Sequence, residues 1–335
     1  KGGWEVVPKI RRMREGKSYP EARLLKLRLA AEGYEPFTGE ADEVYDGQLK
    51  DAISAFQRTH QMTPNGKVSR RFFNEVNVSV DGRIDQILAN LARWRDTSIW
   101  DDSYYVFINV PDYHGEVWKD GSRLHRFRIV VGNRRRGYIR KKRRYGYINA
   151  TPLQSATIEK IIYNPYWNVP DRIRAEEIDV KLEENPNYYE ENNYELVERN
   201  GREWVRQLPG PGNALGVVKI IFPNPHDTYL HDTPAKKLFR KPVRAFSHGC
   251  MRTQYPLDLV KLLLQEDGQY DDVRVRRILA SRRRTVIDLM ETVPIHVEYY
   301  TVRVDDEDGT IHFNTDPYRY VQKMVERMRG KVAKR

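Results

Sequence analysis

Cys250 is the only cysteine in this 335-residue chain, and it lies in the stretch AFSHGCMRT between a histidine–glycine pair and an arginine. A lone cysteine is most often a small buried apolar side chain. It excludes an internal disulfide and any zinc site that needs several cysteines. The polar neighbours of Cys250 favour a different role, because a thiol becomes a strong nucleophile once a nearby group takes its proton.

Two histidines are candidate bases for that proton. His248 precedes the cysteine by two residues, whereas His231 lies in the separate stretch YLHDTP. A base usually reaches its nucleophile from another segment of the chain, but the spacing alone does not choose between the two histidines. Asp232 directly follows His231 and would orient the imidazole through its backbone carbonyl or through its carboxylate.

The residues around the cysteine suit acyl transfer. Gly249 permits a tight turn, which would direct the backbone N–H groups of Gly249 and Cys250 toward a developing oxyanion. Arg252 has a planar guanidinium that matches the geometry of a substrate carboxylate. These residue types predict a covalent site formed on a loop.

Metal binding is the competing chemistry. Four side chains would have to supply the ligands of a zinc ion: His226, His231, His248 and Cys250. Their spacing fits no short closed-site pattern, and the surrounding Pro and Gly residues indicate loops. We therefore expect no metal and no cofactor.

Apolar periodicity predicts a small three-helix unit over residues 22–80. A first helix ends at Gly33, Asp46 is placed to cap a second, and Ser69 is placed to cap a third. The range 81–98 reads as a linker helix whose apolar face docks this unit. Residues 1–21 form an N-terminal extension.

The range 99–315 is rich in β-branched and aromatic residues, with Gly and Asp at the turns, which predicts a mostly β domain in an α+β chain. A helix, PLDLVKLLLQ, follows the cysteine. The acidic segment 171–204 interrupts the strands with eleven Asp and Glu against five Lys and Arg. We interpret 171–209 as a lid-like insertion, because it leaves the strands directly after an aromatic cluster. A basic helical tail, 316–335, ends the sequence.

The basic residues are concentrated in two places. The formal net charge is +11, yet the runs 134–144 and 273–284 contain fourteen of the 58 Lys and Arg residues and no acids. Such runs attract anionic polymers in general, and no nucleic-acid recognition motif accompanies them. We therefore expect no specific nucleic-acid partner. No window of 18 uncharged apolar residues occurs, so no transmembrane segment is expected.

The stretch from His231 to Arg252 resembles the signature of the YkuD-like L,D-transpeptidases, enzymes that remodel peptidoglycan. That signature is a histidine, about fifteen residues, and then Ser/Thr-His-Gly-Cys followed by a hydrophobic residue and Asn or Arg. Four further stretches resemble the larger periplasmic Gram-negative members of this family. They are IVVGN with the following TP, NPYWNVP, LPGPGNALGVVKIIFPN and YLHDTP. Residues 22–80 resemble three-helix peptidoglycan-binding domains through DGQLKDAISAFQRTHQMTPNGKVS.

The resemblance implies a mostly β catalytic domain, a sandwich or open barrel, with Cys250 as nucleophile and His231 as base. It further implies that the backbone carbonyl of Asp232 orients His231. His248 and Arg252 would line the site, with Ser247 shaping the loop. Tyr229 and Trp167 would contact the donor stem.

The implied reaction is transfer of a tetrapeptide stem through a cysteine thioester, with loss of D-Ala, to form a 3–3 cross-link. Carbapenems are expected to acylate the same thiol. Water or a lipoprotein lysine as acceptor would make the chain a carboxypeptidase or an anchoring enzyme, and a wall-binding scaffold with an idle site is the alternative from another class. A peptidoglycan substrate implies a periplasmic location and a removed leader.

Overall fold

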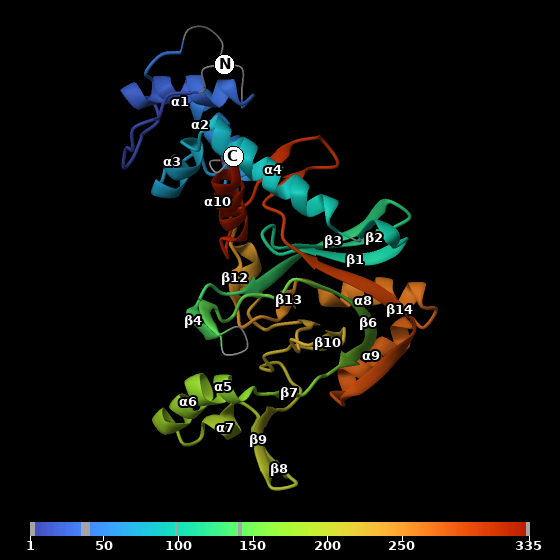
Figure 1. Ribbon diagram of the computed structural model, residues 1–335. Helices are drawn as coiled ribbons and strands as arrows, with labels where there is room; N and C mark the ends of the chain where they lie inside the picture. The colour runs from blue at the N-terminus through green and yellow to red at the C-terminus, as the bar shows by residue number, and fades with distance from the viewer. Residues whose placement is uncertain (1–3, 35–40, 98, 140–142, 333–335) are drawn as a thin grey trace. The chain divides into compact units, whose positions relative to one another are not determined.

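The computed structural model describes residues 4–34, 41–97, 99–139 and 143–332 (Figure 1). The chain forms two compact units. The first contains Lys1–Ser98, Lys241–Val243 and Tyr299–Arg335, and the second contains Ile99–Arg240 and Arg244–Glu298. The strand-rich unit therefore ends at Glu298, and residues 299–315, which the sequence analysis assigned to it, belong with the helical unit.

The first unit is mainly helical. Its helices are α1 Pro20–Ala31, α2 Gly47–Thr59, α3 Arg70–Val76, α4 Val80–Arg95 and α10 Tyr320–Val332. Asp46 caps α2 by accepting from Leu49 N, and Ser69 caps α3 by accepting from Phe72 N, as predicted. Gly33, at φ +82°, follows the end of α1 in the left-handed conformation that favours glycine.

The core of this unit also includes part of the N-terminal extension. Phe56 and Phe72 are fully buried and meet edge to face, with ring centroids 5.5 Å apart. Val7, which is 1% exposed, and Met13 join the same cluster. The helical unit therefore begins before residue 22, because apolar side chains of the extension pack against its helices.

Only part of the apolar face expected on α4 is packed; its members are Ile84, Ile87, Leu88, Leu91 and Trp94. Ile84, Leu88 and Leu91 are 46%, 45% and 57% exposed. Trp94 of this face stacks on Tyr300 with ring centroids 4.1 Å apart, and Asn90, one turn earlier, accepts from Thr301 N through Oδ1 at 2.7 Å. The buried amide of Asn90 helps to set the rotation of this helix, and hydrophobic periodicity does not show it.

The end of the chain packs on this helix. The hairpin of β15 Val302–Val304 and β16 Ile311–Phe313 precedes α10. Both β15 and α10 contact α4. The predicted helix in the C-terminal tail is confirmed by α10, and the tail is part of the helical unit.

The second unit is a barrel-like sheet. Its strands in the described residues run in the order β12, β3, β13, β11, β10, β6, β14, β1, β2, and β2 pairs again with β3 and closes the sheet. Their bounds are β1 Tyr104–Asn109, β2 His114–Lys119, β3 Ser122–Gly132, β6 Gln154–Tyr163, β10 Val218–Ile221, β11 Leu230–His231, β12 Ala245–Ser247, β13 Met251–Thr253 and β14 Thr285–Glu298. Closure removes the free edges that an open sheet would expose. The α+β, mostly β fold class is confirmed.

Helices and a small hairpin complete the unit. The predicted helix after the cysteine is α8 Pro256–Glu266, followed by α9 Asp272–Ser281. The second basic run lies largely on α9. The first lies largely on the hairpin of β4 Arg136–Ile139 and β5 Arg144–Tyr147, and its residues 140–142 lie outside the described residues.

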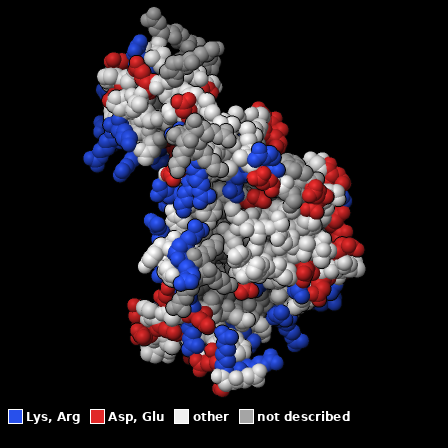
Figure 2. Space-filling model, viewed as in Figure 1, with Lys and Arg blue, Asp and Glu red and all other residues white. Residues whose placement is uncertain are grey.

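The acidic insertion is a compact subdomain. Its elements are β7 Trp167–Asn168, α5 Asp171–Ile173, the π-helix η3 Arg174–Ile178, α6 Asp179–Glu184, α7 Tyr188–Glu191, β8 Tyr194–Arg199 and β9 Arg202–Gln207. The strands β7, β9 and β8 form a three-stranded sheet. Figure 1 shows the helices of the insertion beside β7. Figure 2 shows acidic side chains gathered over the helices of the insertion.

Candidate active site

Strand register brings the candidate catalytic side chains to one face of the barrel sheet. In the parallel pair of β11 and β13, His231 lies opposite Arg252 and Leu230 opposite Met251. The bond from Met251 N to Tyr229 O, 3.1 Å, continues this ladder to Tyr229 and Cys250. Side chains alternate along a strand. His231 and Cys250 therefore share a face as diagonal neighbours on adjacent segments.

The His231 ring is buried and held in one tautomer. The side chain is 5% exposed, and Nδ1 lies 2.5 Å from the backbone carbonyl oxygen of Asp232. A carbonyl only accepts, so Nδ1 carries the proton and Nε2 keeps its lone pair. Burial, followed by the charge of Arg252, lowers the pKa of His231 to about 3, and the hydrogen bond to Asp232 only partly opposes this. The imidazole is therefore neutral at neutral pH.

The Asp232 carboxylate stabilises the neighbouring loop and does not orient the His231 ring. It accepts from Val217 N at 3.1 Å and pairs with Lys236. A Cβ on Gly216 would lie 2.3 Å from Asp232 Oδ2, so the loop packs directly on this carboxylate. Of the two ways in which Asp232 was expected to orient the base, the contact seen is through the backbone carbonyl.

Hydrogen bonds shape the loop that presents the thiol. Ser247 Oγ donates to the carbonyl of Cys250 at 2.5 Å, and Gly249 N–H donates to Ser247 Oγ at 3.2 Å. Gly249 has φ +132°, which favours glycine. Because its N–H is engaged within the loop, the expected pair of oxyanion donors is wrong for Gly249. The Cys250 N–H makes no hydrogen bond within the described part of the chain.

The loop is supported from β3. Thr151 Oγ1 donates to the carbonyl of Gly249 at 2.8 Å and accepts from Gly132 N at 2.9 Å. Asn133 N–H donates to the carbonyl of Ser247, also at 2.8 Å. The threonine of the TP dipeptide thus ties the cysteine loop to the end of β3.

Replacing Gly132 by alanine is expected to destabilise this support. A Cβ there would lie 1.7 Å from the backbone oxygen of Asn149, so the backbone must move. We expect a loss of about 2–3 kcal/mol of unfolding free energy, together with slower thiol alkylation as the loop shifts. Thermal or urea unfolding measures the first and intact mass the second. Gly212→Ala is the matched control, because nothing lies within 4 Å of the added methyl; equal stability of the two variants contradicts the interpretation.

Opposing effects act on the pKa of the Cys250 thiol. Cys250 is half-buried, and its Sγ lies 3.9 Å from the carbonyl oxygen of Asp227. Burial raises its pKa above the ordinary value. Hydrogen bonds from the Tyr229 backbone N–H and hydroxyl, and the charge of Lys219, lower it without reversing the shift. At neutral pH the resting site therefore holds a neutral thiol beside a neutral imidazole.

The insertion contacts the cysteine loop. Glu177, on η3, forms an ion pair with His248 Nε2 at 2.8 Å, and Glu176 pairs with Arg135 at 2.6 Å. Arg172, on α5, donates to Asn149 Oδ1, the side chain that also donates to Asn133. His248 therefore faces the insertion, which is consistent with its lining the site and gives no support to its acting as the base.

Breaking the ion pair between Glu177 and His248 is expected to loosen the insertion with little effect on the fold. The partners are 43% and 28% exposed, so Glu177→Gln should cost less than about 1 kcal/mol. Amide hydrogen exchange of 171–178 should rise severalfold. Glu183→Gln, an exposed change on α6, is the control. Unchanged exchange in Glu177→Gln would show that the pair does not hold the insertion.

The remaining predicted site residues lie in different surroundings. Arg252 is half-buried on the face that holds His231, and its Nε has no hydrogen-bond partner among the described residues. Trp167 instead packs in the core of the insertion, where it contacts Tyr194 with ring centroids 6.3 Å apart. The expected contact of Trp167 with a donor stem therefore has no support from its packing.

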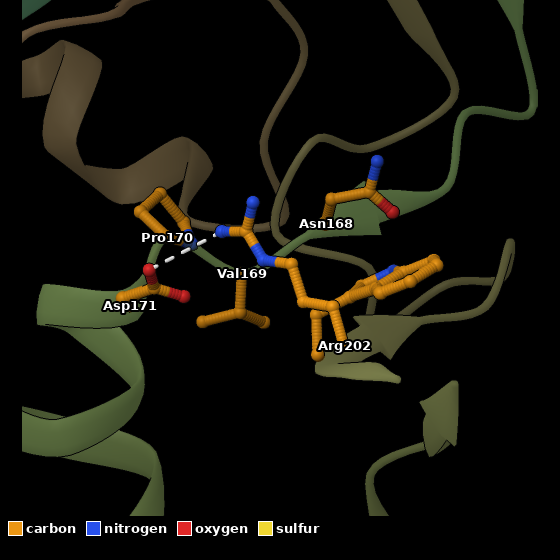
Figure 3. Close-up of a pocket in the computed structure, with 6 residues that line it drawn as sticks. Asn168, Val169, Pro170, Asp171 and Arg202 are labelled. Carbon is orange, nitrogen blue, oxygen red and sulfur yellow. Dashed lines mark hydrogen bonds and ion pairs between the residues drawn. The ribbon is translucent and has the colours of Figure 1, made fainter. Parts of the chain in front are cut away.

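A hollow lies at the base of the insertion. It has a volume of about 480 Å³ and is lined by Asn168, Val169, Pro170, Asp171, Arg202 and Trp204. Figure 3 shows the Arg202 guanidinium reaching across it toward Asp171, at 3.5 Å. None of the predicted catalytic side chains lines this hollow.

Sequence reasoning missed two residues at the site. Lys219 lies opposite His231 in the antiparallel pair of β10 and β11, and its Nζ is 3.6 Å from the ring centroid of Tyr229. Glu177 reaches the site from the insertion. The signal for Lys219 was a lysine within the apolar strand VVKIIF, where a charged side chain on a core strand needs a reason.

Nowhere in 4–34, 41–97, 99–139 and 143–332 do three or more His, Cys, Asp or Glu side chains gather as ligands for a metal ion. Within the same ranges, every helix is too short or too polar to cross a membrane.

Two family descriptions match the chain. Residues 103–286 match "YkuD: L,D-transpeptidase catalytic domain", a range that includes Cys250 and His231. Residues 18–75 match "Putative peptidoglycan binding domain", the range of the first three helices.

Individual proteins are also similar. A Haemophilus influenzae protein named "Putative L,D-transpeptidase" is 30% identical over 294 residues, which is 83% of this chain and 56% of that protein. The chain thus spans about half the length of this relative. An L,D-transpeptidase structure from Stackebrandtia nassauensis is 16% identical, with 89% and 97% coverage and a TM-score of 0.30. One from Xylanimonas cellulosilytica is 14% identical, with 87% and 99% coverage and a TM-score of 0.28.

The catalytic-domain match spans more than half of the 335 residues and contains the strand that carries His231 and the loop that carries His248 and the thiol. The closed sheet of the second unit agrees with the mostly β fold that the sequence signature implies. The chain therefore belongs to the YkuD family of L,D-transpeptidase catalytic domains, joined to an N-terminal peptidoglycan-binding domain.

Proposed function

We propose that this chain forms 3–3 cross-links between peptidoglycan stems, with Cys250 as nucleophile and His231 as general base. The observation that carries the proposal is the state of His231: it is neutral, its Nδ1 proton is committed to the Asp232 carbonyl, and it shares a sheet face with the thiol. Such a ring accepts a proton at Nε2 as soon as a stronger acid forms beside it.

Acylation then proceeds by one proton transfer and one exchange of bonds. As the sulfur attacks the carbonyl carbon of the third stem residue, the S–H proton passes to His231 Nε2. The imidazolium returns that proton to the amine of the terminal D-Ala, whose C–N bond breaks and leaves a thioester on Cys250. Because both groups are neutral at rest, proton transfer accompanies attack and does not precede it.

The oxyanion of the tetrahedral intermediate needs donors in fixed positions. The Cys250 backbone N–H is available in the described structure, since the Gly249 N–H is engaged by Ser247. The Tyr229 hydroxyl, which hydrogen-bonds the sulfur, is a second donor on the same side. As the S–C bond forms, the sulfur becomes a weaker acceptor, so this hydroxyl can turn to the charge that develops on the carbonyl oxygen.

The acceptor decides the product. An amine from a neighbouring stem attacks the thioester, gives the cross-link and restores the thiol. Water would give a carboxypeptidase and a lipoprotein lysine an anchoring enzyme. Contacts from η3 to the cysteine loop favour the amine, because a covered site limits water. Incubation with purified sacculi, digestion and mass analysis of muropeptides separates these acceptors: 3–3 linked dimers support the proposal, and shortened tripeptide stems alone reject it.

A wall-binding scaffold with an idle site is the remaining class of function. Intact-mass measurement after incubation with a carbapenem distinguishes it, since ring opening by Cys250 adds the full mass of the drug. Absence of the adduct would favour the scaffold. We propose a periplasmic location for the same reason that we propose a peptidoglycan substrate: the polymer lies outside the cytoplasmic membrane.

A further inference from the structure

We infer that Lys219 is an electrostatic positioning residue, which stabilises the thiolate form of Cys250 while keeping His231 unprotonated. This inference rests on the proposed role of Cys250 as nucleophile. It concerns the ionisation of the thiol in the free protein, so it is testable without any peptidoglycan substrate.

Register places Lys219 on the catalytic face. Lys219 and His231 are partners across β10 and β11, as His231 and Arg252 are across β11 and β13. Directly paired residues project to the same side of a sheet. The neighbours of Lys219 on β10, Val218 and Ile220, are fully buried on the other side.

Tyr229 connects the ammonium to the sulfur. The Lys219 Nζ lies 3.6 Å from the centroid of the Tyr229 ring, a cation–π contact, and the hydroxyl of the same ring hydrogen-bonds Cys250. The Tyr229 ring also meets His231 edge to face, with centroids 5.6 Å apart. The Tyr229 side chain therefore contacts the lysine, the imidazole and the thiol.

The charge of Lys219 is only partly balanced by a carboxylate, that of Asp227. Among the described residues it forms no ion pair, although its neighbour on β6, Lys160, pairs with Asp288 at 3.4 Å. Burial lowers the pKa of Lys219, and the thiol partly opposes that shift. A half-buried cation without a paired counter-ion is costly, and a nearby thiolate would relieve that cost.

Three other charged groups also shift the pKa values of the side chains on this face. Asp227 raises the pKa of Cys250, so it opposes the lysine at the sulfur. Arg284 lowers the pKa of Lys219 itself. Arg252 acts on His231 in the same direction as Lys219, since both charges lower the pKa of the ring.

The positive charge thus has two useful effects. It lowers the pKa of Cys250, which favours loss of the S–H proton. It also lowers the pKa of His231, which keeps Nε2 unprotonated at rest although it makes the ring a weaker base. Lys219 neither gives nor takes a proton in this scheme: the proton moves from sulfur to imidazole, and the ammonium stays charged throughout.

The test is the rate of Cys250 alkylation by iodoacetamide as a function of pH, followed by intact mass. The reagent is neutral and the chain has one cysteine, so the rate reports the thiolate fraction alone. Loss of the charge in Lys219→Met should raise the pH midpoint by about one unit and lower the rate at pH 8 by about tenfold. Lys219→Arg should keep the wild-type midpoint. Lys160→Met, the same change on the next strand, is the control.

Several outcomes overturn the inference. They are an unchanged midpoint in Lys219→Met, an equal rise in the methionine and arginine variants, or an equal rise in Lys160→Met. Lys219→Gln replaces the methionine variant if the latter fails to give a cooperative thermal transition. If the midpoint moves as expected while muropeptides remain unlinked, the role of Lys219 stands and the proposed cross-linking reaction fails.

Discussion

Cys250→Ala is expected to abolish acylation completely while leaving a folded protein. The side chain is half-buried, and its contacts with the Asp227 carbonyl, at 3.9 Å, and with Tyr229 are the weak hydrogen bonds of a thiol, so its loss costs little stability. No other side chain in the chain carries a thiol. A thioester therefore has no alternative site, and intact mass after carbapenem treatment should show no adduct.

The same variant separates catalysis from binding. Residues 18–75 match a peptidoglycan-binding domain and form a core of their own, far from Cys250 in the sequence. Cosedimentation of Cys250→Ala with purified sacculi should equal that of the unchanged protein. Cys250→Ser is the conservative control, because an unassisted hydroxyl ionises too poorly to replace the thiol. Full adduct formation in either variant would disprove the assignment of the nucleophile.

The second large effect is expected at His231. A positioned general base contributes about 10²–10⁴-fold to a rate, so His231→Gln should slow carbapenem acylation by that factor at pH 7. Glutamine fills most of the space of the ring and limits the cavity that alanine would leave at this buried position. Stopped-flow fluorescence or timed intact-mass measurements give the rate.

The pH dependence distinguishes a lost base from a merely disturbed site. In the unchanged protein His231 stays unprotonated above a pKa of about 3, so acylation should vary little between about pH 5 and 8. Without the base only preformed thiolate reacts, and the rate of His231→Gln should rise about tenfold per pH unit. His248→Gln, a change at the residue that pairs with Glu177, should retain the flat profile. A flat profile in His231→Gln would contradict the assignment of the base.

The titration of His231 also makes the free energy of unfolding depend on pH. An unfolded histidine titrates near ~6.5, whereas folded His231 titrates at about 3. Between these values the unfolded chain binds the extra proton, so stability falls as the pH is lowered through this window. Burial lowers the pKa of His60 and His114 as well, and their effect has the same sign. Urea unfolding at pH 4 and pH 7 should therefore show a smaller acid loss in His231→Gln than in the unchanged protein.

Much of this protein was readable from residue types and spacing. Local rules predicted the caps at Asp46 and Ser69, the glycine after α1 and the helix after the cysteine, because a cap or helix depends on a few consecutive residues. A lone thiol two residues after one histidine and nineteen after another identified the chemistry. The resemblance to a family, rather than spacing, then chose between those histidines.

Only the tertiary structure decided which side chains meet. Strand pairing brings Lys219 beside His231 and points the Asp232 carboxylate at a loop, although nothing in the local sequence distinguishes these outcomes. The buried bond of Asn90 to Thr301 joins α4 to the chain after Glu298, which belongs to the helical unit, while Ile84 and Leu88 of α4 stay exposed. The physical reason is range: capping, turn and periodicity signals act over a few residues, whereas register, burial and the fields that set a pKa come from segments far apart in the chain.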